Sequence, residues 1–508
     1  MSFFEIVSVG LSVSLHPANL GYAFAGALIG TMVGVLPGLG PSAALALLLP
    51  ISFGMSPVGG IIMLAGIYYG AQYGGSTTSI LVNIPGEASS IVTTLDGHQM
   101  ARRGDAGAAL AIAAISSFIA GTVGTVGLML LAPPLAGFAL SFGPPEYAAL
   151  IILGFMTLTF MAQGSMLKAL MMTAFGLFLA TIGLDEVSGR SRFTLGVTEL
   201  LDGIELVPAV MGLFGVSEVL VNLEAGLRQR DVFVQKIRGL FPSREEFRRS
   251  AKPVMRGTVL GFLLGILPGG GSILSSFVSY AMEKRLSKHP ERFGTGMIEG
   301  VAGPEAANNA GATGAFIPLL TLGLPTNAVV AMLLGALMIH GVEPGPLLMQ
   351  KHPDIFWGVI FSMYVGNAML LILNLPLVGL WVRLLRVPYP ILFPLILLFT
   401  LIGSYSLANS TWDIQVMIAM GVVGYVMRKT GYEAAPLVVA LVLGSLFENA
   451  LRQSLILSGG SFSIFFVRPI ALVLMIAAIG LLLLAVIGGA RVRGRTLGLV
   501  EVDDDQRA

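Results

Sequence analysis

No charged residue occurs between Glu5 and Glu87, and this uncharged stretch restricts where the chain can fold. A membrane crossing takes about 20 mostly apolar residues, so the stretch can supply several crossings. Only 11% of the 508 residues are charged, whereas about a quarter is usual in soluble proteins. The pattern therefore predicts a polytopic helical membrane protein and excludes a soluble enzyme, a nucleic-acid binder and a disordered chain. Similar uncharged gaps lie at 106–145, 257–282, 306–342, 355–382 and 387–412.

The lack of cysteine and the lack of basic residues near the N-terminus exclude further kinds of site and segment. The chain has no cysteine, which excludes disulfides, thiolate metal sites and a cysteine nucleophile. Its first basic residue is Arg102, so the N-terminus lacks the basic flank of a secretory signal peptide and is expected to be retained.

Basic residues concentrate between Glu224 and Arg256, where nine of them occur with four acidic residues. Short loops rich in Lys and Arg stay on the cytoplasmic side, so we interpret 224–256 as a cytoplasmic linker between two halves. An amphipathic helix anchored to lipid headgroups is the alternative, and it places the segment on the same side.

Two motifs recur in the same order on either side of this linker. Residues 34–42 read GVLPGLGPS and residues 265–272 read GILPGGGS, an offset of 231. Ile84-Pro85-Gly86 pairs with Leu324-Pro325-Thr326 at an offset of 240. We infer a duplication with repeats at 1–223 and 257–467, followed by an extra helix at 468–490 and a charged cytoplasmic tail at 491–508.

The distribution of basic residues predicts the topology. Residues 257–282 are apolar, contain a Pro-Gly-Gly-Gly turn and have basic clusters at both ends, so both ends can be cytoplasmic only in a re-entrant hairpin. A matching hairpin is expected at 20–50. Five crossings in each half would give the halves opposite orientations, as in inverted-repeat transporters, within an all-α fold of about 10–13 membrane segments. Arg190 and Arg192 violate the positive-inside pattern. The expected spans are 58–82, 106–132, 144–163, 165–184, 205–222, 310–340, 356–382, 389–408, 412–427, 434–447 and 469–490.

Polar residues gather where Pro and Gly interrupt the apolar segments. Interrupted backbone must be buried in protein or face an aqueous cavity, and half-helices that begin there direct free N–H groups at an anion. Ser, Thr and Asn add small donors and acceptors. The expected substrate-binding residues are Gly38, Gly40, Ser42, Ser76, Thr77, Thr78, Gly269, Gly270, Gly271, Ser272, Asn308, Asn309 and Thr326. The expected cation-binding residues are Asn83, Glu305, Thr313 and Asn327.

Helix dipoles indicate the size of the ligand. Each helix N-terminus is equivalent to roughly half a positive charge, so four of them would supply about two, enough for a dicarboxylate. A tricarboxylate would need Na+ or H+ bound with it. Alternatively, the glycines only permit close helix packing and the hydroxyls bond across helices. An anion channel is a rival function, and a membrane-embedded enzyme is a weaker one because no nucleophile and base occur at a recognisable spacing. No phosphate-binding loop or zinc motif is present, and no resident cofactor is expected.

The motif series resembles the large membrane subunit, the TctA type, of the tripartite tricarboxylate transporters. The resemblance lies in Gly30 to Ser42, Tyr68 to Leu81, Asn83 to Gly86, Leu267 to Gly271, Pro304 to Ala310 and Leu322 to Thr326. It implies a multi-pass protein of the bacterial inner membrane that imports carboxylates such as citrate by ion symport. It also implies a small membrane subunit (TctB type) and a periplasmic solute-binding protein (TctC type) as partners, with no nucleic acid.

Overall fold

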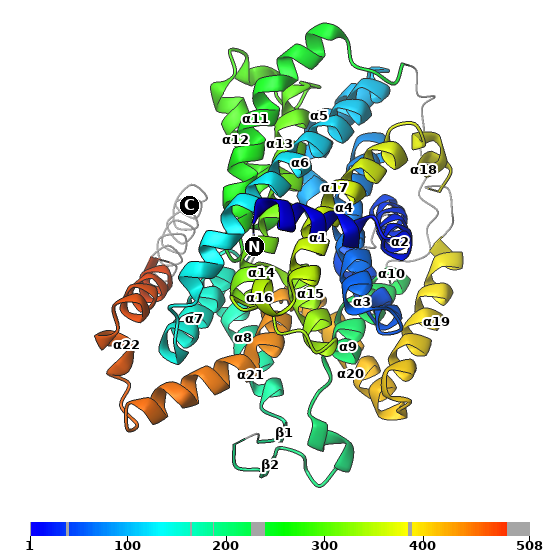
Figure 1. Cartoon of the computed structure of the whole chain (residues 1–508). Coiled ribbons are helices and arrows are strands. Elements are labelled where there is room, and N and C mark those ends of the chain that lie inside the picture. Colours follow the sequence, from blue (N-terminus) through cyan, green and yellow to red (C-terminus); the bar gives the residue numbers. More distant parts are fainter. Residues whose placement is uncertain are drawn as a thin grey trace, which may run out of the picture.

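The computed structural model describes residues 2–36, 40–162, 165–185, 187–224, 239–384 and 389–484, and the side chains of 389–392 are left aside. The fold is all-α, as predicted, apart from one short hairpin of β1 (Gly183–Leu184) and β2 (Ser191–Arg192) (Figure 1). Gly38, residues 225–238 of the predicted linker and the C-terminal tail lie outside the described residues.

Five described helices are long and apolar enough to cross a membrane by length and composition. Several others are shorter apolar helices of 10–17 residues, as expected where spans are broken. The five are α2 (Pro17–Val35), α6 (Ala106–Ala139), the helix Leu206–Glu224 that comprises α9, a π-helical turn and α10, α17 (Pro353–Asn374) and α21 (Ala434–Leu457). The remaining helices are α1 (Phe3–Ser14), α3 (Pro41–Ser52), α4 (Pro57–Val82), α5 (Ile91–Arg102), α7 (Pro144–Phe160), α8 (Met166–Ala180), α11 (Arg244–Ile266), α12 (Gly271–Leu286), α13 (Glu299–Gly314), α14 (Phe316–Leu322), α15 (Ala328–Ile339), α16 (Leu348–Lys351), α18 (Val378–Leu384), α19 (Tyr389–Ala408), α20 (Thr411–Thr430), α22 (Ile464–Val467) and Pro469–Leu484.

The predicted hairpin at 257–282 corresponds to α11 and α12, which pack side by side at the top of Figure 1. Helix α11 begins at Arg244, inside the segment expected to be a linker. Its start is a capping box, because the Glu246 N–H donates to Ser243 Oγ (3.3 Å) and the Ser243 N–H donates to Glu246 Oε2 (2.7 Å). The basic residues from Arg244 onward therefore belong to the first helix of the hairpin.

Two expected spans differ from the structure. The segment 310–340 is divided among α13, α14 and α15, because Gly323 ends α14 in the left-handed conformation (φ 67°) and Pro325 follows. The segment 356–382 is divided between α17 and α18. By contrast, the span expected at 434–447 is longer than predicted, because it is part of the 24-residue helix α21.

The two halves pack their first helices in the same way. A Cβ on Gly30 of α2 would lie 2.5 Å from Ile67 O of α4, and one on Gly261 of α11 would lie 2.6 Å from Ala307 Cα of α13. Gly30 and Gly261 are 231 residues apart, and the residues they contact, Ile67 and Ala307, are 240 residues apart. These are the two offsets found between the sequence motifs. Close helix packing is therefore the role of these glycines. The opposite orientation of the two halves stays a prediction.

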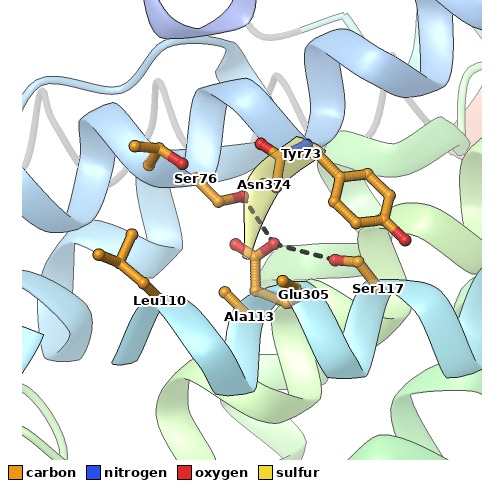
Figure 2. Close-up of a pocket in the computed structure, with 9 residues that line it drawn as sticks. Tyr73, Ser76, Leu110, Ala113, Ser117, Glu305 and Asn374 are labelled. Carbon is orange, nitrogen blue, oxygen red and sulfur yellow. Dashed lines mark hydrogen bonds between the residues drawn. The ribbon is translucent and has the colours of Figure 1, made fainter. Parts of the chain in front are cut away.

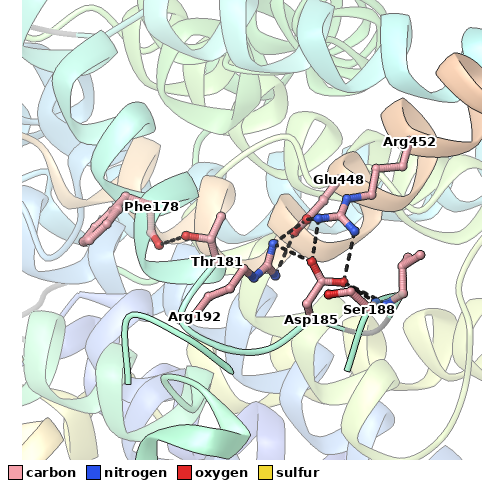
Figure 3. Close-up of polar contacts among 8 residues, drawn as sticks. Phe178, Thr181, Asp185, Ser188, Arg192, Glu448 and Arg452 are labelled. Carbon is pink, nitrogen blue, oxygen red and sulfur yellow. Dashed lines mark hydrogen bonds and ion pairs between the residues drawn. The ribbon is translucent and has the colours of Figure 1, made fainter. Parts of the chain in front are cut away.

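The β1–β2 hairpin is tied to α21 by a group of four charged side chains (Figure 3). Arg452 donates to Asp185 Oδ1 (3.0 Å) and Oδ2 (2.7 Å), and Arg192 donates to Glu448 Oε1 (2.6 Å). Hydrogen bonds from Arg452 and from the Ser188 N–H hold the pKa of the Asp185 carboxyl well below its ordinary value. Arg192, which violates the positive-inside pattern, is thus paired with acidic residues.

Candidate functional site

The predicted polar residues gather around α4, which is buried from Val58 to Leu81. This helix packs against α2, α3, α5, α6, α13, α15 and α17, so its polar side chains meet residues from both halves of the chain.

Glu305 of α13 is fully buried and accepts hydrogen bonds from three hydroxyl groups on three other helices. Ser76 of α4 donates to Glu305 Oε2 over 2.6 Å, and Ser117 of α6 donates to the same oxygen over 3.5 Å (Figure 2). Thr93 of α5 donates to Oε1. Asn309 lies beside this group and donates to Ser117 Oγ over 2.7 Å.

Glu87 provides a second buried carboxylate, in the segment between α4 and α5. Its Oε1 accepts hydrogen bonds from Ser89 Oγ and from Asn308 Nδ2, the latter over 3.2 Å. The side-chain amide of Gln72 lies 2.9 Å from Glu87 Oε2 when its nitrogen is assigned to face that carboxylate, as the neighbouring donors and acceptors require. The same amide contacts Ser272 Oγ over 3.5 Å. This group therefore joins α4, the Glu87 segment, α12 and α13.

Neither carboxylate has a basic partner among the ion pairs found within the described ranges. Burying an ionised carboxylate costs several kcal/mol unless its charge is balanced. Hydroxyl and amide donors reduce that cost but leave the net charge in place. The centre can therefore hold an additional anion only if protons or cations neutralise Glu87 and Glu305.

The glycine turn between α11 and α12 meets the break between α14 and α15. The Gly269 N–H donates to Thr326 O over 2.8 Å. Asn327 caps α15 by accepting from the Val330 N–H (3.0 Å), and its amide nitrogen donates to the Tyr68 hydroxyl over 3.3 Å. The predicted residues 269–272, Thr326 and Asn327 thus form one group beside α4.

Two helices at the breaks begin without a side-chain cap. Helix α12 begins after Gly270 and α3 begins after Gly40, and in both cases no side chain bonds to the first N–H groups. The N-terminus of α15 is occupied by its own Asn327. The two uncapped ends supply roughly one positive charge, about half of what four ends would give.

The first break also contacts α4, through Thr78. Its hydroxyl donates to Val35 O at the end of α2 over 2.7 Å. On the same helix, Gln72 contacts the second glycine turn at Ser272. Thr78 lies less than two helical turns after Gln72. That spacing is roughly 9 Å along the helix axis, so α4 connects the end of α2 to the turn that begins α12.

The remaining expected residues have other surroundings. Asn83 is the exposed C-cap of α4 in the left-handed conformation (φ 57°), the position that Gly323 has in the second half, and the structure assigns it a backbone role. Thr313 donates to Asn309 O within its own helix. Thr77 lines a small cavity beside Glu305. For Gly40 and Ser42, at the start of α3, no side-chain hydrogen bond to the cluster is found in the part of the chain that the structure describes.

Sequence analysis did not select five residues of the cluster, which are Gln72, Glu87, Thr93, Ser117 and Asn374. Gln72 lies inside the recognised motif 68–81, and Glu87 follows Pro85-Gly86. Thr93 and Ser117 lie inside helices, where no Gly or Pro break marked them, whereas Asn374 ends α17 two residues before Pro376, a signal that was not used.

Comparison with known proteins gives a consistent result. A family model described as "Tripartite tricarboxylate transporter TctA family" matches residues 20–439. The chain is 51% identical over 491 residues, 97% of its length and 98% of the relative's, to the "Uncharacterized 52.8 kDa protein in TAR-I ttuC' 3'region" of Agrobacterium vitis. It is also 50% identical over 231 residues, 46% of its length and 96% of the relative's, to the "Uncharacterized protein in TAR-II ttuC' 3'region" of the same organism. No solved structure matches the chain.

Proposed function

The chain belongs to the tripartite tricarboxylate transporter TctA family, and from this premise we propose that it imports a tricarboxylate or a related carboxylate by symport with Na+ or H+. In this proposal it is the large transmembrane subunit and works by alternating access in the bacterial inner membrane. A small membrane subunit completes the membrane complex, and a periplasmic solute-binding protein delivers the substrate.

The observation that carries the proposal is that α3 and α12 begin directly after Gly40 and Gly270 of the recurring motif. Among the described residues no side chain caps either helix, and in α3 the first free N–H is that of Ser42, because Pro41 has none. Helix N-termini of this kind bind carboxylate groups through backbone N–H groups and the helix dipole. Glycine at the turn lets an anion approach the backbone closely.

Coupling to a cation is supported by the buried charges next to the start of α12, where Gln72 contacts both Glu87 and Ser272. Glu87 and Glu305 are buried without a basic partner, so an incoming carboxylate is repelled until their charge is neutralised. Binding of Na+ or H+ would therefore favour binding of the substrate, which is the requirement for symport. In inverted-repeat transporters, rigid-body movement of one portion against another then exposes the occupied site to the other side.

The test is uptake of radiolabelled carboxylates into proteoliposomes that contain both membrane subunits and receive the binding protein. A panel of mono-, di- and tricarboxylates is compared with and without an inward Na+ gradient and an inward proton gradient. We expect cation-dependent uptake and counterflow, in which internal unlabelled substrate accelerates entry of the label. Uptake without counterflow would indicate an anion channel and reject the proposal.

A variant at the first glycine turn tests the site itself. Gly40 has an extended backbone (φ −72°, ψ 168°), and a Cβ placed there meets no atom within 4 Å. Gly40→Leu should therefore fold normally, but its side chain covers the start of α3, and uptake should be lost. Gly137→Leu is the matched control, because Gly137 of α6 is exposed and also has open space around it. Equal uptake by the two variants would reject the turn as the substrate site.

A further inference from the structure

A small cavity lies between α4, α6, α13 and α17, next to Glu305 (Figure 2). Its free volume is about 10 Å³, which is room for a single water molecule or a small ion. Oxygen atoms dominate its polar lining, which consists of Tyr73, Ser76, Thr77, Ser117, Glu305 and Asn374.

Asn374, the last residue of α17, places an unsatisfied acceptor at this cavity. Its side-chain nitrogen donates to Leu370 O (3.0 Å) and to Thr31 Oγ1 (3.3 Å), so the amide orientation is fixed by two acceptors. Its Oδ1 has no donor in the structure, although the residue is only 5% exposed. A buried acceptor without a donor is unfavourable, and either a water molecule or a cation would satisfy it; the carboxylate of Glu305 at the same cavity favours the cation.

The charge and size of the cavity indicate which cation. One carboxylate faces it and no basic side chain lines it, so a monovalent ion makes the site neutral, whereas a divalent ion leaves an excess charge. No group of three or more His, Cys, Asp or Glu that could hold a metal occurs in the described ranges, which disfavours a transition-metal site. Hard oxygen ligands and a volume this small favour Na+ over K+.

We propose that this cavity binds one Na+, ligated by the Glu305 carboxylate, Asn374 Oδ1 and the hydroxyl oxygens of Ser76 and Ser117. Its assignment as the coupling ion rests on the proposed function, whereas the binding itself does not. The ion would link α17 to α4, α6 and α13 at the end of α17, in addition to the hydrogen bonds of Asn367 with Tyr73 of α4 and Phe118 of α6. That neutralised arrangement is the one competent to accept a carboxylate.

The first experiment measures Na+ binding without substrate. The purified protein in detergent is heated in NaCl, KCl or choline chloride at constant ionic strength, and the unfolding midpoint is followed against Na+ concentration. We expect a saturable stabilisation by Na+ that K+ and choline do not give. Equal midpoints in the three salts, or a stabilisation that depends on pH and not on Na+, would overturn the proposal in favour of no ion or of a proton.

Variants locate the ion. Asn374→Leu removes the free oxygen at similar volume, and Ser117→Ala removes a hydroxyl from the opposite wall; each should raise the Na+ concentration for half-maximal stabilisation about tenfold or more. Glu305→Gln should abolish the Na+ effect. Ser362→Ala is the control, because Ser362 is a buried hydroxyl of the same helix α17 that donates to Val359 O and is not among the residues lining the cavity. An unchanged Na+ dependence in both Asn374→Leu and Ser117→Ala would place the ion elsewhere.

Uptake assays separate this inference from the proposed function. Normal Na+ binding with no carboxylate uptake in the complete system would reject the function and leave the site in place. Carboxylate uptake that needs no Na+, with no Na+ stabilisation, would reject the site and leave the function in place. Size-exclusion profiles of each variant in detergent show whether it is folded before either comparison is made.

Discussion

The contact between α2 and α4 gives a prediction whose size follows from the structure. In Gly30→Ala, the new Cβ would lie 2.5 Å from Ile67 O and 2.8 Å from Ile67 Cα, both backbone atoms. Ordinary C···O contacts are about 3.3–3.6 Å, so the two helices must separate by about 1 Å. Overpacking costs about 1–3 kcal/mol, and the upper end applies because backbone cannot rotate away. Alanine regains about 1 kcal/mol of helix propensity, so we expect a net loss of about 2 kcal/mol.

The measurement is equilibrium unfolding by SDS in mixed micelles, which reports a free energy. Gly154→Ala of α7 is the matched control, because a Cβ there meets no atom within 4 Å and only the gain in helix propensity of up to about 1 kcal/mol remains. Gly261→Ala in the second half should behave like Gly30→Ala, since its Cβ would lie 2.6 Å from Ala307 Cα. If Gly30→Ala is as stable as Gly154→Ala, the close-packing argument and the repeat equivalence drawn from it are wrong.

Three further outcomes are expected. Arg452 is the main cause of the lowered pKa of Asp185, so their pairing stabilises the fold above the unfolded-state pKa of about 3.9. This contribution is lost as pH falls through the folded-state pKa. Arg452→Gln should therefore lower the unfolding midpoint at pH 7, and its difference in midpoint from wild type should become smaller below about pH 4. Asn309→Ala should raise the cation concentration needed for half-maximal uptake, measured in proteoliposomes at saturating substrate. Thr78→Ala removes the hydrogen bond to Val35 O at the end of α2 and should raise the apparent KM for substrate, and an unchanged KM would argue against that role.

Much of the fold could be predicted because the bilayer excludes charged side chains from membrane spans, and because helices that pack closely within it need glycine at their contacts. Uncharged stretches predicted the helices, and basic clusters on both sides of 257–282 predicted the pair α11 and α12. The segment 310–340 was drawn as one span although Pro325-Thr326-Asn327 was recognised as a break within it, because hydropathy is the same for a broken and a continuous helix. Gly323 was the further signal for where α14 ends. The early start of α11 was also readable, from Ser243 and Glu246 as a capping box.

The candidate site was predictable only where breaks marked it. Ser76, Asn309 and Glu305 lie in polar or Pro-containing motifs, and the structure brings them together. Ser117 lies inside an apolar helix and Asn374 ends another two residues before Pro376, and both reach the cavity beside Glu305 only because α6 packs against α13 and α17 packs against α4 and α6. Their place in the cluster depends on helix rotation and crossing, which the periodicity of an apolar membrane helix does not fix.

The charges of the centre impose an order on binding. Glu87 and Glu305 contribute two negative charges when ionised, and the uncapped start of α12, which Gln72 contacts at Ser272, supplies roughly half a positive charge in return. The empty centre is therefore anionic and repels a carboxylate. Neutralising both carboxylates by Na+ or H+ reverses the sign and leaves the helix ends free to attract the substrate. In the proposed symport the cations therefore bind before the substrate, and departure of the substrate lowers their affinity, because its negative charge no longer attracts them.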